Sequence, residues 1–201
     1  MAIVQDLKET PLCKLAYKYG TDKCPKIRHG YTPFYYKLFN PKRQKIKKVL
    51  EIGIGYKREK GKQYEGWLHG ASLRMWRDFF PNAMIYGVDI REEAMFNDKR
   101  IRSFICDQNN EKDLLNLLDK IGRDIDIIID DGSHIHQHQV FSARILRPLI
   151  PRESDYIIED VTYCNTVKRR LGQFDCEVYK CPLLGVPITI HNDRLVVVKM
   201  K

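Results

Sequence analysis

The chain has 201 residues, of which 43% are hydrophobic, and it carries a formal net charge of +9. This length and composition are typical of one globular domain with a full hydrophobic core, and they leave little room for a second domain. No apolar stretch is long enough to span a membrane, and the N-terminus lacks the apolar core of a signal peptide. We therefore expect a cytoplasmic protein that does not bind membranes.

The six cysteines are scattered without a CxxC pair, so we expect free thiols rather than disulfides. Cys13 and Cys24 could supply half of a zinc site, but no second Cys or His pair has matching spacing. The basic residues are densest at 41–48 and 56–62. Such segments attract nucleic acid or a small anionic substrate, but they are most often solvated loops, and nucleic acid is not the partner that we favour.

Two short helices are predicted near the N-terminus. Apolar residues between positions 6 and 19 follow a helical period, and Pro11 either starts or interrupts that helix. Thr32 and Pro33 suit the N-cap and the first position of a second helix over 32–39.

From residue 48 onward, predicted strands alternate with predicted helices. This alternation is typical of an α/β fold with a parallel sheet and right-handed crossovers, and the last two strands could form an antiparallel pair. The predicted strands cover 49–53, 84–89, 101–106, 125–130, 156–159, 177–181 and 194–200. The predicted helices cover 72–80, 113–121, 137–150 and 164–171, with a short helix after 84–89.

Two of these strands end abruptly in acidic residues. Ile127-Ile128-Ile129 runs into Asp130-Asp131-Gly132-Ser133-His134, and Tyr156-Ile157-Ile158 runs into Glu159-Asp160. Apolar runs of this kind form strands buried on both faces, and open α/β sheets bind ligands at the carboxyl ends of such strands. Up to four carboxylates and one imidazole would then share one crevice, which suits a hard metal ion with a base beside it. The alternative is that the first pair of acids caps a helix and the second pair is solvated.

The earlier strands also end in polar residues. Leu50-Glu51-Ile52-Gly53-Ile54-Gly55 is a glycine turn that lets the backbone approach a ligand, although alone it is a weak signal. The next strand ends in Asp89, where an acid would hold a ribose diol, and the third is followed by Asp107-Gln108, where a carboxylate could accept a bond from an adenine amino group. Turn-forming acids are the alternative at each position. Together, the order Glu/Gly, Asp, Asp is the pattern of the S-adenosylmethionine methyltransferases.

Six motifs between roughly residues 15 and 165 are specific as a set. They are Tyr17-Lys18-Tyr19-Gly20-Thr21-Asp22-Lys23, Gly30-Tyr31-Thr32-Pro33-Phe34-Tyr35, Leu50-Glu51-Ile52-Gly53, Gly70-Ala71-Ser72-Leu73-Arg74-Met75-Trp76, Ile129-Asp130-Asp131-Gly132-Ser133-His134 and Ile158-Glu159-Asp160-Val161. With these motifs the chain resembles the metal-dependent sugar O-methyltransferases of macrolide biosynthesis. The mycinamicin type is the nearest, and the cephalosporin-hydroxylase-like family is related.

The resemblance implies a class I methyltransferase fold, which is a Rossmann-like three-layer α/β sandwich with a mostly parallel seven-stranded sheet and an antiparallel last strand pair. It implies a single domain in which residues 1–45 form a helical cap over the active site and 46–201 form the core. The implied cofactors are S-adenosylmethionine and Mg²⁺ or another divalent cation. The implied metal ligands are Asp131, Glu159 and Asp160, the catalytic residues are His134 as general base and Asp131, and the cofactor-binding residues are Glu51, Gly53, Gly55, Ser72, Asp89, Asp107 and Gln108.

Two departures from the family concern the acceptor. A basic insertion at 57–68 follows the glycine turn, and the chain is much shorter than the antibiotic-tailoring members. We expect an O-methyltransferase for a hydroxylated small molecule, a sugar or glycoside, and leave a homo-oligomer open. The alternatives are a nucleotide-linked or catechol-like acceptor, and a non-catalytic module that binds S-adenosylmethionine or nucleic acid. We interpret His136 and His138 as surface histidines, and Asp130 has no assigned role.

Overall fold

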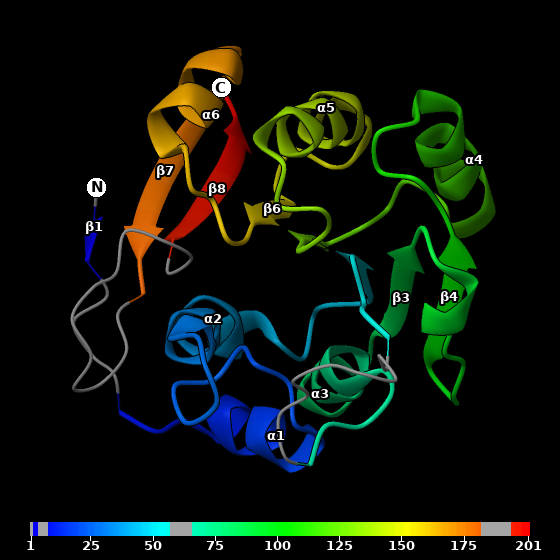
Figure 1. Ribbon diagram of the computed structural model, residues 1–201, viewed down its shortest axis with the longest axis vertical. Helices are drawn as coiled ribbons and strands as arrows, with labels where there is room; N and C mark the ends of the chain where they lie inside the picture. The colour runs from blue at the N-terminus through cyan, green and yellow to red at the C-terminus, as the bar shows by residue number, and fades with distance from the viewer. Residues whose placement is uncertain (1, 4–7, 57–65, 182–193) are drawn as a thin grey trace.

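The fold is organised around one sheet with the strand order β1-β7-β8-β6-β5-β2-β3-β4 (Figure 1). The computed structural model describes residues 2–3, 8–56, 66–181 and 194–201. In this part of the chain the strands are β1 (Ala2–Ile3), β2 (Lys48–Ile52), β3 (Met84–Asp89), β4 (Ile101–Ile105), β5 (Ile127–Asp130), β6 (Asp155–Ile158), β7 (Phe174–Lys180) and β8 (Arg194–Met200).

The central strands are parallel, and the end of the sheet is mixed. β2 pairs in parallel with β3 and β5, β3 with β4, and β5 with β6. β8 runs antiparallel to both β6 and β7, so the predicted antiparallel last pair is confirmed. The predicted seven strands are all present, and the short β1 adds an eighth that pairs in parallel with β7 at the edge. Every residue of β5 and β6 is buried, which explains their unbroken apolar runs.

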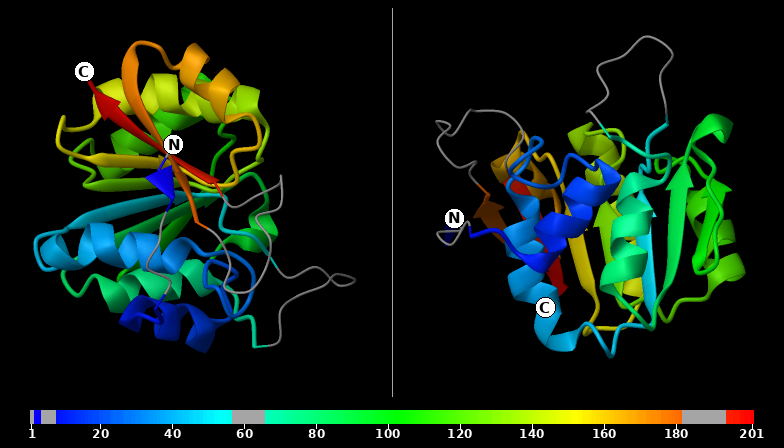
Figure 2. Two further views of the ribbon diagram at one scale, coloured as in Figure 1. Left: turned by 90° about the vertical axis from the view of Figure 1, so that its left-hand side faces the viewer. Right: turned by 90° about the horizontal axis from the view of Figure 1, so that it is seen from below.

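Helices cover both faces of the sheet, which makes the predicted three-layer sandwich (Figure 2). One apolar core joins the first three helices to side chains such as Val49 and Ile127, and the other joins the last three to side chains such as Leu50 and Ile128. The helices are α1 (Pro11–Tyr19), α2 (Tyr31–Phe39), α3 (Ala71–Phe79), α4 (Glu111–Ile121), α5 (His136–Leu146) and α6 (Cys164–Arg170), with 3₁₀ turns η1 (Asn40–Lys42), η2 (Glu92–Ala94) and η3 (Arg147–Leu149).

The first two helices begin at different kinds of cap. α1 starts at Pro11, and the hydroxyl of the preceding Thr10 accepts a hydrogen bond from the Cys13 backbone N–H at 3.2 Å. The predicted N-cap at Thr32 is wrong, because Gly30 holds the N-cap position and α2 begins at Tyr31, two residues before the predicted first position at Pro33. The Thr32 hydroxyl instead lies 3.1 Å from the Cys13 sulfur, where it joins α2 to α1.

Aromatic contacts fix α2 against α3. Tyr35 and Phe39 are fully buried, and the Tyr35 ring lies 5.3 Å from the Trp76 ring between centroids. α1 is held to α3 by a hydrogen bond from the Tyr19 hydroxyl to Asp78. These contacts place the segment between α1 and α2 beside the carboxyl ends of the central strands, where it lines the cavity described below. The boundary at residue 45 between cap and core stays a prediction.

All six cysteines are free, as expected from their spacing, and all six are buried. None of the described helices is long and apolar enough to cross a membrane. Most of the predicted basic insertion at 57–68, namely residues 57–65, lies outside the described residues.

Candidate active site

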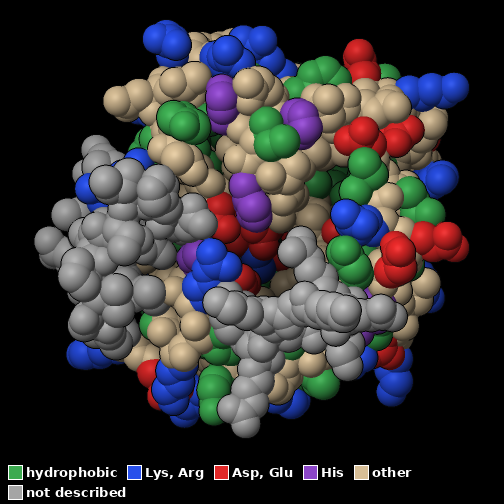
Figure 3. Space-filling view, viewed as in Figure 1, with side chains coloured by type: hydrophobic (Ala, Val, Ile, Leu, Met, Phe, Trp, Pro, Cys, Tyr) green, Lys and Arg blue, Asp and Glu red, His purple; other side chains and the backbone are tan. Residues whose placement is uncertain are grey.

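A cavity of about 760 Å³ opens at the carboxyl ends of the parallel strands. Its wall combines residues at or just after the ends of β2 to β6 with five residues between positions 21 and 29. Acidic side chains lie within a hollow on this face of the molecule, and histidine side chains lie next to them (Figure 3). Both the size and the position are typical of a small-molecule site in an open α/β sheet.

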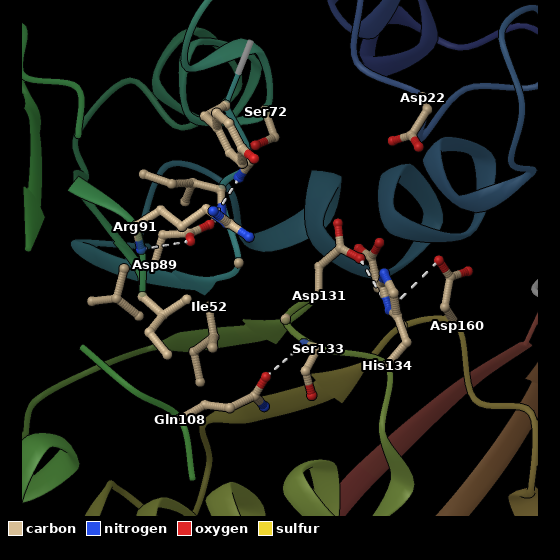
Figure 4. A pocket seen from close by; sticks show the side chains of 18 of the residues that line it. Asp22, Ile52, Ser72, Asp89, Arg91, Gln108, Asp131, Ser133, His134 and Asp160 are labelled. Carbon is tan, nitrogen blue, oxygen red and sulfur yellow. Dashed lines mark hydrogen bonds and ion pairs between the residues drawn. The ribbon is translucent and has the colours of Figure 1, made fainter. Parts of the chain in front are cut away.

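The glycine turn after β2 forms one half of the cavity. Gly53 has a φ of 82°, and a Cβ added there would lie 2.3 Å from the backbone oxygen of Asp131, so only glycine fits. The Asp89 carboxylate accepts hydrogen bonds from the backbone N–H groups of Ile54 and Gly55 at 3.2 and 3.1 Å, which fix the turn. Ser72 lies with Asp89 on this side of the cavity (Figure 4).

Gln108 connects the loop after β4 to the loop after β5. Its Nε2 donates to Oδ1 of Asp130 at 3.1 Å, and its Oε1 accepts from the Ser133 backbone N–H at 2.6 Å. A Cβ added at Gly132 would lie 2.0 Å from this Oε1, so a larger residue there would displace the Gln108 amide. Asp107 and Gln108 both line the cavity. Both polar atoms of the Gln108 amide are therefore already hydrogen-bonded within the protein, and its contact with a cofactor stays a prediction.

Asp130, which the sequence left without a role, is a buried hydrogen-bond acceptor beneath the cavity. Besides Gln108, its carboxylate accepts from the Gly132 N–H at 3.4 Å, the Ser142 hydroxyl at 2.7 Å and the Tyr156 hydroxyl at 3.3 Å. Burial raises the pKa of Asp130 to about 6, although these hydrogen bonds oppose the rise. Asp130 thus orders the turn that carries Asp131 and His134.

Asp131, His134 and Asp160 form the other half of the cavity. One potential ligand atom from each lies within 4.8 Å of the other two. Nδ1 of His134 is 4.0 Å from Oδ1 of Asp131 and 3.8 Å from Oδ2 of Asp160 (Figure 4). His134 and Asp160 have φ values of 57° and 52°, a region that non-glycine residues adopt at an energetic cost, so the surrounding structure must hold both in place.

Glu159, the remaining predicted metal ligand, is buried with protein donors on both carboxylate oxygens. Oε1 accepts from the Tyr35 hydroxyl at 2.6 Å, and Oε2 accepts from the Lys23 ammonium at 2.7 Å. Burial raises the pKa of Glu159 well above its ordinary value, with Lys23 opposing the rise and Asp131 adding to it. Each oxygen keeps a second lone pair, so these contacts are compatible with metal ligation.

Lys23 is a site residue that the sequence analysis missed. Its Nζ lies 2.5 Å from Oδ2 of Asp131, 2.7 Å from Oε2 of Glu159 and 3.3 Å from Oε1 of Glu51, and its side chain is 1% exposed. Burial alone would lower the pKa of Lys23, but these carboxylates raise it well above its ordinary value, so the ammonium stays charged. The Tyr-Gly-Thr-Asp-Lys motif pointed to this segment, but the sequence did not indicate which residues its lysine contacts.

Two tyrosines of α2 were also missed. The Tyr31 hydroxyl donates to Oδ1 of Asp160 at 2.5 Å, and its ring stacks on His29 with centroids 4.9 Å apart. Tyr35 donates to Glu159 as described. Burial, with the neighbouring carboxylates, raises the pKa of both tyrosines well above the ordinary value, so both hydroxyls remain donors.

Glu51 and His138 differ in how they lie relative to the cavity. Glu51 is fully buried beside Lys23 rather than on the cavity wall, burial raises its pKa, and its predicted contact with a cofactor stays a prediction. His138, interpreted as a surface histidine, lines the cavity with its Nδ1 3.0 Å from the Ser133 hydroxyl. His136 packs its ring edgewise against Tyr163.

No protein-family model matches the chain. It is 38% identical over 157 residues to the mycinamicin VI 2''-O-methyltransferase of Micromonospora griseorubida, which covers 77% of this chain and 37% of the relative. It is 39% identical over 150 residues to the demethylmacrocin O-methyltransferase of Streptomyces fradiae, which covers 75% of this chain and 36% of the relative. The chain therefore spans less than two fifths of the length of these curated relatives.

Solved structures give the same result. The MycE methyltransferase from the mycinamycin biosynthetic pathway, in complex with Mg and SAH, matches with a TM-score of 0.66 and 35% identity over 80% of this chain and 40% of that chain. MycE with Mg, SAH and mycinamycin VI matches with a TM-score of 0.70 and 26% identity over 96% of this chain and 55% of that chain. By sequence and by fold, the chain belongs to the class I methyltransferase family that includes these sugar O-methyltransferases.

Proposed function

We propose that this chain is an S-adenosylmethionine-dependent O-methyltransferase that requires Mg²⁺ or another divalent cation and methylates a hydroxyl of a sugar, glycoside or similar small molecule. The observation that carries the proposal is the meeting of two half-sites in one cavity. One is the glycine turn with Asp89, and the other is the cluster of Asp131, His134 and Asp160. Similarity to named sugar O-methyltransferases supports it.

The glycine turn fits the cofactor. Gly53 and Gly55 leave the backbone open to a ligand, and Asp89 stands at the strand end where a carboxylate would hold a ribose diol. Both turn N–H groups donate to Oδ2 of Asp89, whereas Oδ1 accepts only the Arg91 backbone N–H among the described residues and keeps a lone pair for a ribose hydroxyl. S-adenosylmethionine supplies an activated methyl group on a sulfonium, and the protein's task is to align it with the acceptor oxygen.

The acidic cluster fits a hard divalent cation. Asp131 and Asp160 offer carboxylate oxygens toward one point, Glu159 lies beside them, and all-oxygen ligation suits Mg²⁺. A divalent cation held there lowers the pKa of a sugar hydroxyl and orients it. Structures of the relative MycE contain Mg. We assign Asp131, Glu159 and Asp160 as the ligands.

His134 accepts the proton of the acceptor hydroxyl. Its side chain is 47% exposed on the cavity wall, so it can reach a bound acceptor, and Asp160 at 3.8 Å stabilises the ring once it is protonated. Asp131, 4.0 Å away, adds a second negative charge in the same direction. The acidic cluster thus both orients the base and favours its charged product.

The acceptor class rests on the names of the relatives, which include an O-methyltransferase of a rhamnosyl tetracenomycin-C besides those of mycinamicin VI and demethylmacrocin. Because the chain spans less than two fifths of those proteins, the particular acceptor is left open between free sugars and glycosides. A soluble hydroxylated small molecule is the proposed partner.

Two measurements test the proposal. S-adenosylhomocysteine (SAH) should raise the melting temperature, since ligand at 100 times its dissociation constant stabilises a protein by about 2.7 kcal/mol. Labelled methyl should then pass from S-adenosylmethionine to members of a panel of deoxyhexosyl glycosides in the presence of Mg²⁺, and excess chelator should stop it. Absence of the SAH shift would contradict the cofactor assignment, and full turnover in chelator would contradict the metal role. Binding of duplex nucleic acid unchanged in Asp131→Asn would favour the non-catalytic module.

A further inference from the structure

We infer that Lys23 and Tyr31 are positioning residues of the metal site: each holds one oxygen of a metal-binding carboxylate and thereby turns the other oxygen toward the cation. Both belong to residues 20–39, here called the cap segment. The inference rests on the proposed metal dependence. It gives the cap segment a second role, because a segment that only covered the acceptor would leave cation affinity unchanged.

The two oxygens of Asp131 have different partners. Oδ2 accepts from the Lys23 ammonium at 2.5 Å, whereas Oδ1 faces Nδ1 of His134 at 4.0 Å. The ammonium therefore contacts the oxygen of Asp131 that is not the one facing His134. Lys23 fixes the rotation of this carboxylate without standing between Asp131 and His134.

The two oxygens of Asp160 also have different partners. Oδ1 accepts from the Tyr31 hydroxyl at 2.5 Å, whereas Oδ2 faces Nδ1 of His134 at 3.8 Å. Tyr31 is fully buried and its ring stacks on His29, so the hydroxyl is held in one place. Within the described residues, the contacts of Lys23 and Tyr31 leave one oxygen of each carboxylate without a hydrogen bond, and these two oxygens lie 4.0 and 3.8 Å from the same imidazole nitrogen.

Lys23 also keeps the carboxylates together. Its ammonium joins acids from three strand ends, namely Glu51 of β2, Asp131 after β5 and Glu159 after β6. Carboxylates this close repel one another, and in a buried site the repulsion is poorly screened. Without the ammonium the acids would separate or turn to other donors, and the paired oxygens of Asp131 and Asp160 would lose their alignment.

The structure also predicts whether removal of Lys23 weakens or tightens metal binding. If Lys23 only competed with the metal as a rival positive charge, removing it would tighten metal binding. If it positions the ligands, removing it weakens binding, and partners of metal ligands commonly contribute 10- to 100-fold to affinity. The contact of Lys23 with Oδ2 of Asp131, and not with the oxygen that faces His134, favours the second outcome.

The experiment measures Mn²⁺ and Mg²⁺ binding to the full chain by titration calorimetry, with SAH present at saturation. Lys23→Met should bind Mn²⁺ about 10- to 100-fold more weakly than the wild type, and Lys23→Arg should recover part of that loss. Tyr31→Phe, which keeps the ring, should lose about tenfold. Lys26→Met is the matched control, because Lys26 lies in the same segment with a 58% exposed side chain paired to Glu9. Its affinity should stay within twofold of the wild type.

Circular dichroism and thermal melting establish that each variant is folded at the titration temperature. Folded Lys23→Met with unchanged or tighter Mn²⁺ binding would overturn the inference. Should that variant not fold, Tyr31→Phe decides, and wild-type affinity in it would overturn the inference equally. A wild-type chain that binds no divalent cation would instead overturn the proposed metal dependence, and the inference with it.

Discussion

Gln108 and Asp130 are joined by a hydrogen bond of 3.1 Å, although β2 and β3 separate their strands in the sheet. The bond draws the loop after β4 across the ends of the two intervening strands, where the glycine turn and Asp89 lie. Through the second Gln108 bond to Ser133, the same side chain reaches the turn that carries His134. The two half-sites of the cavity are therefore connected through a buried amide and a buried carboxylate.

Replacing Asp130 tests this connection. All four groups that contact the Asp130 carboxylate are hydrogen-bond donors. In Asp130→Asn an NH₂ group replaces one acceptor oxygen, so some of these donors would lose their hydrogen bonds. We expect the free energy of unfolding to fall by about 1–3 kcal/mol in urea titrations. Asp119→Asn, at an exposed position, should change it by less than about 0.5 kcal/mol. Equal stability of the two variants would contradict the role given to Asp130.

The glycine turn offers a matched pair of substitutions. Gly53→Ala would place a Cβ 2.3 Å from the Asp131 backbone oxygen, whereas Gly55, with a φ of 65°, has open space around its added Cβ. Both variants carry the cost of a left-handed alanine, about 1 kcal/mol, but only the first also displaces the loop after β5. We expect Gly53→Ala to weaken SAH binding at least tenfold by calorimetry and Gly55→Ala to weaken it less. The reverse order would contradict the close approach seen at Gly53.

Much of the fold could be predicted from the sequence because its signals are local. The apolar runs of β5 and β6 reflect burial on both faces, and their acidic ends mark one edge of the sheet. The start of α2 was missed because the Thr32 hydroxyl takes part in a tertiary contact. It lies 3.1 Å from the Cys13 sulfur and does not cap the N-terminus of α2. The preference of threonine for helix N-caps gives no information about a contact with Cys13 of another helix.

The candidate site could be predicted only on the side that the strands form. Asp131, His134 and Asp160 meet because the carboxyl ends of adjacent parallel strands must meet. Lys23 and Tyr31 contact acids 108 and 129 residues away, and no periodicity relates such positions. The role of Asp130 was also hidden, because neighbouring acids at a strand end point to opposite sides and only the structure tells which one reaches the cavity.

Asp78 attaches α1 to α3, and its protonation should loosen that attachment. Partial burial would raise the pKa of Asp78, but hydrogen bonds from Tyr19 and Arg77 prevail and lower it. A lowered carboxyl pKa stabilises the fold above the unfolded value of about 4, and this stabilisation is lost as the pH falls below it. We expect Asp78→Asn to be less stable than the wild type by about 1–2 kcal/mol at pH 7, with the difference shrinking below about pH 4. Urea titrations from pH 7 to pH 3 measure this, with exposed Asp175→Asn as control. A difference that does not decrease at all between pH 7 and pH 3 would exclude the ionised carboxylate as its source.

The variant His134→Ala distinguishes a role in methyl transfer from a role in cofactor binding. The imidazole lies on the cavity wall with Nδ1 3.8 Å from Asp160, whereas the glycine turn and Asp89 form the other half of the cavity. Loss of a general base lowers kcat by about 10²–10⁴-fold, and SAH affinity should change by less than about threefold because the turn is untouched. His136→Ala is the control, since its ring packs against Tyr163 instead of the acids. Single-turnover methyl transfer followed across pH 5–9 provides the measurement. Undiminished transfer in His134→Ala would leave the acceptor proton to another group and would make His138, which also lines the cavity, the next base to test.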